Sequence, residues 1–203
     1  MTVLKVYGVA TNRTMRTTWM ANELGLEYEL IETSGRDGSS KSPEFLAINP
    51  NGSVPAIQDD GHTMWESLAI NLYLAKKHGG ELAPKDDDEN GLVLQWSFWA
   101  AGNVEMTALD ILFNRMLLPE DERNAAVADA AEEKLAKPLA VLNGALADRD
   151  YLVGDRFTVA DLNVAAIMSW VKMGGVDMSA HGNVTDWLGR CLDRPAFAAA
   201  RGA

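Results

Sequence analysis

Residues 49–70 read Asn-Pro-Asn-Gly-Ser-Val-Pro-Ala-Ile-Gln-Asp-Asp-Gly-His-Thr-Met-Trp-Glu-Ser-Leu-Ala-Ile. Within this stretch, two short β-prone runs, 56–58 and 63–65, flank Asp60-Gly61. A glycine accepts the positive φ that a tight hairpin turn requires, so the two runs are expected to pair as a hairpin. The second run passes directly into residues 67–78, where Leu and Ile recur on a helical pattern. The stretch therefore predicts a hairpin followed at once by a helix.

The segments before this stretch predict a mixed α/β unit. Residues 3–7 are rich in Val and Leu and read as a buried strand that ends at Gly8. Residues 14–24 are expected to form a helix and residues 28–31 a second strand, while the serine- and glycine-rich residues 33–42 predict a mobile loop. The expected order is strand, helix, strand, loop, hairpin and helix.

The pattern changes after residue 78. Residues 79–88 contain two glycines, a proline and three aspartates, which is typical of a linker. Almost everything beyond is expected to be helical, in segments 89–118, 120–147, 159–173 and 184–193. The fold class is therefore α/β plus all-α, with an α/β domain over 1–78, a linker over 79–88 and an all-helical domain over 89–203.

Composition restricts the classes of partner. The chain has 203 residues, 47% of them apolar, and a net charge of −11. A nucleic-acid backbone or an anionic membrane surface is bound through clustered Lys and Arg, so neither is expected as a partner. There is no apolar run of about 20 residues and no secretory signal at the N-terminus, so a cytoplasmic location is expected. A small anionic ligand stays compatible with this charge, because a local site need not share the global sign.

Cysteine and histidine usage gives no sign of a metal site or a disulfide. The single cysteine, Cys191, permits no internal pair, and we expect it to be a buried core residue. The three histidines are widely spaced in the sequence. No metal is predicted.

Val54-Pro55, at the entrance to the third expected strand, is the first motif with chemical content. A Val-Pro step can hold a cis peptide bond that fixes a sharp turn, leaving the N–H and C=O of Val54 outside the sheet. Those groups could then pair with an extended peptide in the manner of an added strand. The alternative is an ordinary entry loop with a trans proline.

Glu66-Ser67, where a strand turns directly into a helix, is the second motif. Ser67 can cap the helix, and the N–H groups of the first helical turn form a site for a carboxylate. Glu66 beside them could pair with an ammonium group. Together they could hold both charges of an α-amino acid, although simple helix capping explains the same residues.

The loop 8–14, between the first strand and the first helix, is the third motif. Thr11 and Asn12 could donate a hydrogen bond to a sulfur anion at the positive end of the helix. Lowering the pKa of a thiol by two units takes about 2.7 kcal/mol, and one hydrogen bond to a charged group contributes roughly 1.5–3 kcal/mol. A single well-placed donor nearly suffices, although either residue could instead be an inert helix cap.

These motifs, in this order, resemble the cytosolic glutathione transferase family, and the resemblance covers essentially the whole chain. Its most specific elements are Val54-Pro55, Glu66-Ser67 ahead of 68–70, and the box Thr158-Val159-Ala160-Asp161 followed by Leu162. The similarity is to bacterial-type members related to the phi, theta and nu classes. It implies a thioredoxin-like N-terminal domain of βαβ-ββα order, an all-helical C-terminal domain and a homodimer. We expect the box itself to be a structural capping box.

The resemblance implies roles for six residues that would bind glutathione. Glu66 and Ser67 would hold the γ-glutamyl group, and Val54 would pair through its backbone with the cysteinyl part, with Pro55 in the cis form. Lys41 stands where phi-like members place a basic residue for the glycine carboxylate. Ser53 stands where some relatives have a polar contact with glutathione.

The loop that should activate the thiol departs from the family pattern. Many relatives carry Ser, Tyr or Cys there, whereas this chain offers Thr11 and Asn12 as catalytic candidates. An alignment with a one-residue gap before Thr14 places Thr11 at the serine of phi-like members, and an ungapped alignment to other bacterial-type members favours Asn12. The absence of Cys from the loop argues against the cysteine chemistry of omega- and beta-like members.

The resemblance also implies a second substrate, a small hydrophobic electrophile lying between the domains. Trp99, Asn103 and Met106 recur at helical spacing with Trp96 and Asp110, on a helix that borders the electrophile pocket in the family. The alternative is that the tryptophans and Met106 are simply core residues.

The function that follows from the resemblance is that of a glutathione transferase, with glutathione as co-substrate and no metal. The enzyme would bind glutathione and activate it as the thiolate for attack on the electrophile. Two other functions stay open at this point. One is a glutathione-dependent disulfide-bond reductase that uses the same pocket, and the other is a non-catalytic binding protein that keeps the fold.

Overall fold

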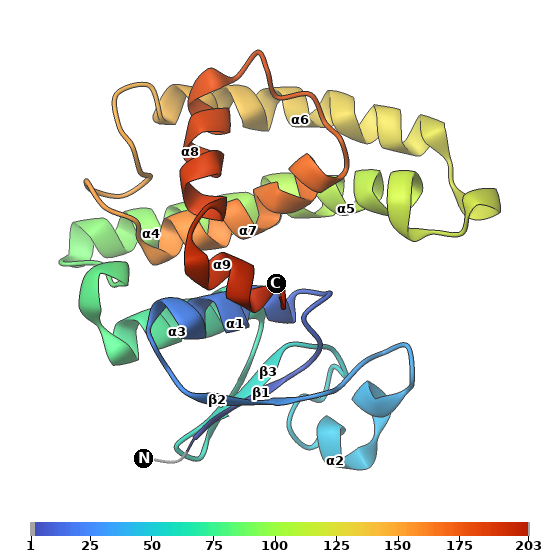
Figure 1. Cartoon of the computed structure of the whole chain (residues 1–203), viewed down its shortest axis with the longest axis vertical. Helices are drawn as coiled ribbons and strands as arrows, with labels where there is room; N and C mark the ends of the chain where they lie inside the picture. The colour runs from blue at the N-terminus through green and yellow to red at the C-terminus, as the bar shows by residue number, and fades with distance from the viewer. Residues whose placement is uncertain (1–2, 203) are drawn as a thin grey trace. The chain divides into compact units, whose positions relative to one another are not determined.

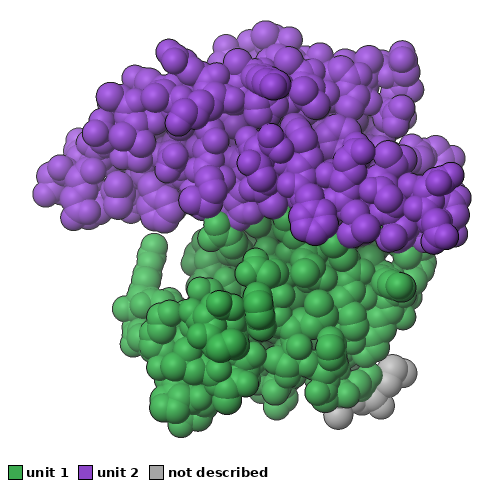
Figure 2. Space-filling view, turned by 180° about the vertical axis from the view of Figure 1, so that it is seen from behind, with its two compact units in different colours: residues 1–83, 194–203 green, residues 84–193 purple. Residues whose placement is uncertain are grey.

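The computed structural model describes residues 3–202, which divide into two compact units. Unit 1 comprises residues 1–83 and 194–203, and unit 2 comprises residues 84–193 (Figure 2). The sequence-based division at 78 and 89 stays a prediction, but the structure adds the last helix to unit 1, whereas the sequence assigned it to the helical domain. Each unit is described separately below.

The sheet of unit 1 has four strands in the order β2-β1-β3-β4. These are β1 (Leu4–Tyr7), β2 (Tyr28–Ile31), β3 (Ala56–Asp59) and β4 (His62–Trp65). β1 runs parallel to β2 and antiparallel to β3, and β3 pairs antiparallel with β4. The hairpin turn has φ of +49° at Asp60 and +82° at Gly61, as the sequence predicted. The thioredoxin-like expectation is therefore confirmed.

The two faces of this sheet are covered by different helices (Figure 1). Val6 and Ile57 are partners in the ladder and share one face, on which α1 (Thr14–Glu23) and α3 (Ser67–His78) lie. Both side chains are fully buried. On the opposite face, Tyr7 and Ala56 form a small core with Phe45 of the short helix α2 (Pro43–Leu46).

Residues 33–42 are more ordered than the sequence predicted. They contain a 3₁₀ turn, η1 (Ser39–Lys41), and lead into α2, which the sequence reading missed. Ser42 caps α2, its hydroxyl accepting from the N–H of Phe45 at 3.2 Å, and Pro43 occupies the first helical position. Ser-Pro at this point is a helix start signal that the surrounding Ser and Gly residues obscured.

The last helix, α9 (Pro195–Ala200), packs against α1 within unit 1. The ring of Phe197 meets Trp19 edge-on with centroids 4.7 Å apart. Arg194 donates to both carboxylate oxygens of Glu23, at 2.6 and 2.7 Å. The chain end thus stabilises the helix that follows the loop 8–14, a contact between residues about 170 apart that no local pattern predicts.

Unit 2 is helical, as the sequence predicted. Its α-helices are α4 (Asp87–Ala100), α5 (Met106–Leu112), α6 (Ala125–Ala145), α7 (Val159–Met173) and α8 (Gly182–Leu192). The predicted helix 89–118 is present but contains two π-helical segments, Ala101–Glu105 and Phe113–Leu117. α6 begins later than predicted, because Asn124 caps it by accepting from the N–H groups of Ala126 and Val127.

The core of unit 2 is organised by Asp161 near the start of α7. Its carboxylate accepts hydrogen bonds from the N–H groups of Leu152 and Thr158, the Thr158 hydroxyl and the indole N–H of Trp187. The predicted capping box is present. Cys191 is fully buried, which confirms that expectation. Within residues 3–202, no helix combines the length and the apolar character needed to cross a bilayer.

Glu89 and Arg156 form an ion pair in unit 2 that makes stability depend on pH. Arg156 donates to both carboxylate oxygens, at 3.0 and 2.7 Å, and the N–H of Lys85 donates to one of them at 2.8 Å. These hydrogen bonds, chiefly that of Arg156, lower the pKa of Glu89 from its usual 4.5 to about 2. The unfolded chain therefore binds this proton first as the pH falls, so the pair stabilises the fold fully above pH 4.5 and loses its effect toward pH 2.

We expect Glu89→Gln to reduce the free energy of unfolding at pH 6, and the gap to the unmodified protein to narrow as the pH approaches 2. Urea unfolding followed by circular dichroism at several pH values measures this gap. Glu133→Gln on α6 is the control, because Glu133 is exposed and has no ion-pair partner within the described residues. A gap that stays constant with pH contradicts the assignment.

Candidate functional site

Three segments of unit 1 meet at one edge of the sheet. Ala56 pairs with Tyr7 on one side and with Trp65 on the other. The residues just beyond these three partners therefore leave the sheet side by side: the loop after Tyr7, the turn before Ala56 and the start of α3 after Trp65. All three motifs singled out in the sequence lie in these segments, so the fold brings them together.

The turn before β3 presents free backbone groups. The Val54-Pro55 peptide bond is cis, which confirms that expectation. Among residues 3–202, neither the N–H nor the C=O of Val54 has a hydrogen-bond partner. Pro55 is buried and has no N–H, so the ladder of β3 cannot extend into this turn. The arrangement leaves one donor and one acceptor at the sheet edge for an added extended peptide.

Asn49 holds the loop that leads into this turn. Its side chain is buried and donates to the C=O of Ser53 at 2.6 Å, while its oxygen accepts from the N–H of Asn51 at 3.0 Å. The hydroxyl of Ser53 itself has no partner within the described residues. Lys41 reaches the same loop from η1, its Nζ donating to the C=O of Asn51 at 3.1 Å. The ammonium group of Lys41 is therefore held beside this loop.

Glu66 stands in a backbone conformation that a non-glycine residue seldom adopts, with φ of +75°. Such conformations cost of the order of 1–3 kcal/mol and gather at ligand-binding positions. Its C=O accepts from the N–H of Ile70 at 2.9 Å, which starts α3. Its side chain is exposed and makes no capping hydrogen bond. The carboxylate is thus turned toward solvent beside the helix start.

Ser67 does not cap α3, and that sequence-based interpretation is wrong. Ser67 is the first helical residue and is buried. Its hydroxyl accepts a hydrogen bond from Nη1 of Arg16 on α1, at 3.4 Å. Sequence patterns could not show this contact, because the two residues lie 51 positions apart. With no side chain capping α3, the N–H groups of its first turn stay available to an anion.

The two catalytic candidates in the loop 8–14 differ in their hydrogen bonds. The side-chain oxygen of Asn12 accepts from the N–H of Thr14 at 2.8 Å, and the N–H of Asn12 donates to the C=O of Val9 at 3.3 Å. Asn12 therefore serves the start of α1, as one of the alternatives expected. Thr11 is exposed, and no described residue forms a hydrogen bond with it.

Tyr7, the tyrosine nearest to this loop, is committed elsewhere. Its hydroxyl donates to the side-chain oxygen of Gln58 at 2.7 Å. Burial, aided by the negative charge of Glu29, raises the pKa of this hydroxyl. Tyr7 therefore stays protonated at neutral pH with its hydrogen already donated.

The three residues predicted to border the electrophile pocket lie in unit 2, around the first π-helical segment. Trp99 packs edge-on against Trp96 at 5.1 Å, and Asn103 donates from Nδ2 back to the C=O of Trp99 at 3.0 Å. Met106 is 63% exposed, so its side chain is not part of the core. π-Helical segments occur often at functional sites.

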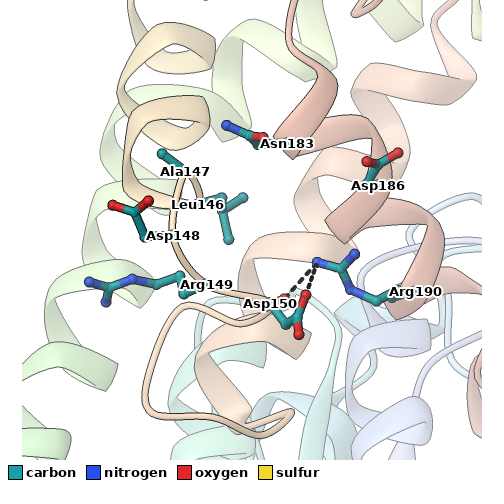
Figure 3. Close-up of a pocket in the computed structure, with 8 residues that line it drawn as sticks. All are labelled: Leu146, Ala147, Asp148, Arg149, Asp150, Asn183, Asp186 and Arg190. Atoms are coloured by element: carbon teal, nitrogen blue, oxygen red, sulfur yellow. Dashed lines mark hydrogen bonds and ion pairs between the residues drawn. The ribbon is translucent and has the colours of Figure 1, made fainter.

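Unit 2 also has an open polar cavity of about 330 Å³, and none of the residues that line it is a predicted site residue. Residues 146–150, which follow α6, and residues of α8 line it, and Figure 3 shows Arg190 reaching across to Asp150. Arg190 donates to the C=O of Asp150 at 2.9 Å and pairs with its carboxylate at 3.4 Å. Within residues 3–202, no three His, Cys, Asp or Glu side chains group as metal ligands would.

Comparison with known proteins identifies the family. The model of the glutathione S-transferase N-terminal domain matches residues 2–76, and that of the C-terminal domain matches residues 104–195. The chain belongs to the glutathione S-transferase family. It is 34% identical to glutathione S-transferase 3 of Zea mays, over 97% of this chain and 92% of the relative. It is 31% identical to glutathione S-transferase F13 of Arabidopsis thaliana, over 96% and 93%.

Solved glutathione transferases have the same fold. The theta class enzyme of Xanthomonas axonopodis pv. citri, solved with glutathione bound, superposes with a TM-score of 0.92 at 29% identity, covering 100% of this chain and 99% of that one. Glutathione S-transferase-I, solved with lactoylglutathione, gives a TM-score of 0.90 at 29% identity and covers 99% of both chains. These relatives support a glutathione transferase enzyme.

Two residues of the site were missed from the sequence, Asn49 and Arg16. Asn49 heads the Asn-Pro-Asn-Gly turn, and its side chain bonding to backbone two residues on is a known turn signal. Arg16 gave no signal, because a single arginine on a helix is normally exposed.

Substitution of Gly52 tests how closely the loop before the Val54-Pro55 turn is packed. Gly52 has φ of +58°, and a Cβ there would lie 2.9 Å from the C=O of Ser40 and 2.5 Å from Nζ of Lys41. We expect Gly52→Ala to lower the free energy of unfolding by about 1–3 kcal/mol, measured by urea titration. Gly91→Ala in α4 is the control: nothing lies near its Cβ, so a gain of about 0.5–1 kcal/mol is expected. Equal effects of the two substitutions would contradict the strained-loop assignment.

Proposed function

We propose that the chain binds glutathione along the sheet edge of unit 1 and activates its thiol for attack on a hydrophobic electrophile. The observation that carries this proposal is the free N–H and C=O of Val54 in the cis turn beside the start of α3. A tripeptide can pair with that backbone as a short added strand. The glutathione-bound theta class relative of the same fold supports the choice of tripeptide.

The charges around the edge suit the two ends of glutathione. Glu66 is proposed to pair with the ammonium of the γ-glutamyl group, and Ser67 with the uncapped N–H groups of α3 to bind its carboxylate. Lys41 is proposed to bind the glycine carboxylate, with Ser53 as a further polar contact; Lys41 already lies at the Asn51 loop. The proposed site thus offers an anion for the one cation of the ligand, hydrogen-bond donors for one carboxylate and an ammonium group for the other.

Thr11 is the better candidate for the thiolate donor. Both residues keep a side-chain donor, since no described residue accepts from the Thr11 hydroxyl or from Nδ2 of Asn12. The side chain of Asn12, however, is anchored in the loop by its oxygen, whereas the hydroxyl of Thr11 can turn to a ligand without breaking a hydrogen bond. In the proposed step the thiol proton goes to water and Thr11 donates a hydrogen bond to the remaining sulfur anion. The thiolate then forms a bond to the electrophilic carbon, and any leaving group departs with the electron pair. No covalent bond to the protein forms.

Three further proposals carry over expectations from the sequence and from the family. The electrophile is proposed to be small and hydrophobic, with Trp99, Asn103 and Met106 among its contacts. A homodimer is proposed, which the mass from light scattering tests, and a cytoplasmic location, which fractionation of the source cells tests.

Calorimetry and thiol titration test the proposal. Reduced glutathione at millimolar concentration should release or absorb measurable heat, and the absorbance of the bound thiolate should give a pKa well below that of free glutathione. Thr11→Val should raise the pKa of the bound thiol by roughly one to two units, toward that of free glutathione. The reason is that one hydrogen bond to a charged group is worth about 1.5–3 kcal/mol. Asn12→Ala should change this pKa less, acting mainly on stability. If neither variant shifts the pKa, activation by this loop is excluded.

The two alternatives give different outcomes. A panel of one aryl halide and one small disulfide separates conjugation from disulfide reduction. Binding of glutathione without turnover on either substrate would favour a non-catalytic member of the family.

A further inference from the structure

Arg16 is a buried arginine that the proposed chemistry does not yet use. It lies on α1, its side chain is fully buried, and its Nη1 approaches the hydroxyl oxygen of Ser67 at 3.4 Å. Arginine is rarely buried completely, because removing a guanidinium from water is costly. A buried arginine directed at a ligand-binding serine therefore calls for a reason beyond packing.

The contact fixes the direction of the Ser67 hydroxyl. A guanidinium can only donate, so Ser67 must accept from Arg16. A hydroxyl has one hydrogen to donate, and none of the described residues accepts it from Ser67. The hydrogen is therefore left for a group outside the chain, and an anion is the best acceptor for it.

We propose that Arg16 is a positioning residue for glutathione: it holds the Ser67 hydroxyl as a donor to the α-carboxylate of the γ-glutamyl group. It also places a permanent positive charge behind the start of α3. This inference rests on the proposed function, because it concerns the same ligand. Arg16 acts through Ser67 and need not touch the ligand itself.

The local charge balance explains why an arginine is suited to this position. The chain carries −11 overall, and Glu66 adds a negative charge beside the site. The start of α3 offers only the partial positive charge of its N–H groups. A guanidinium stays charged at all relevant pH values, whereas a buried lysine can lose its proton. Arg16 thus makes the carboxylate end of the site cationic without exposing a cation.

Binding of three tripeptides to four proteins tests the proposal. The tripeptides are reduced glutathione, γ-aminobutyryl-Cys-Gly, which lacks only the α-carboxylate, and glutaryl-Cys-Gly, which lacks only the ammonium. The proteins are the unmodified chain, Arg16→Met, Arg16→Lys and Lys76→Met. Lys76→Met is the matched control, because it removes the same charge from an exposed position in the last turn of α3. Dissociation constants come from calorimetry.

The preference for glutathione is the ratio of the dissociation constant of γ-aminobutyryl-Cys-Gly to that of glutathione. We expect this ratio to be lower in Arg16→Met than in the unmodified chain by about tenfold or more, the value of one charge-assisted hydrogen bond. The preference over glutaryl-Cys-Gly should stay within about twofold, because the partner of the ammonium is Glu66. Arg16→Lys should restore part of the carboxylate preference, and Lys76→Met should change neither ratio. A purely structural role for Arg16 would weaken all three ligands alike.

The outcomes separate this inference from the proposed function. If the unmodified chain does not bind glutathione, the proposed function fails. If it binds but Arg16→Met keeps the full preference for the α-carboxylate, Arg16 has no positioning role. Should circular dichroism show that Arg16→Met does not fold, Arg16→Leu takes its place, since leucine also lacks both the donor and the charge, and an unchanged preference there is equally decisive.

Discussion

The pairing of β3 on both sides is the constraint on which the site depends. Ala56 lies between Tyr7 and Trp65, so the chain must leave the sheet at three adjacent points along one edge. Pro55 ends the ladder there, because it has no N–H and its peptide bond with Val54 is cis. The backbone of Val54 consequently has nothing in the sheet to bond with. In the proposed function, its free N–H and C=O are the groups with which one extended peptide pairs.

The proposed site combines pairing with the backbone of Val54 and a small set of charges of both signs. Backbone pairing at Val54 is indifferent to side chains and would accept many extended peptides. In the proposed function, selectivity comes from Glu66, Ser67 and Lys41, which are assigned to the two ends of the tripeptide. Glu66 is held with a positive φ, at a cost of the order of 1–3 kcal/mol that the surrounding structure must offset. That cost is reasonable for a residue whose carboxylate has to face solvent at a helix start.

Sequence patterns predicted those parts of the fold whose signals are local. The hairpin at Asp60-Gly61, the limits of β2, α3 and α7, and the capping box of Asp161 all follow from residues within a few positions of one another. The helix α9 and the contact between Arg16 and Ser67 depend on residues far apart in the chain, so they were missed. The capping role predicted for Ser67 was wrong for the same reason: its hydroxyl accepts a hydrogen bond from the buried Arg16 on another helix. The roles of the site residues in ligand binding stay predictions.

The choice between Thr11 and Asn12 shows how structure adds to an ambiguous alignment. A one-residue gap decides which of them matches the serine of related enzymes, and sequence alone cannot position that gap. The hydrogen bonds within the loop give a physical reason to prefer Thr11 in the proposed function. The carboxamide oxygen of Asn12 meets the N–H of Thr14, which can only donate, so the orientation of this amide is fixed by chemistry. A residue that starts a helix cannot be moved without cost, whereas Thr11 can turn its hydroxyl to a ligand with no loss inside the loop. In the proposed function, Asn12 thus holds the loop in place and Thr11 is left to act on the ligand.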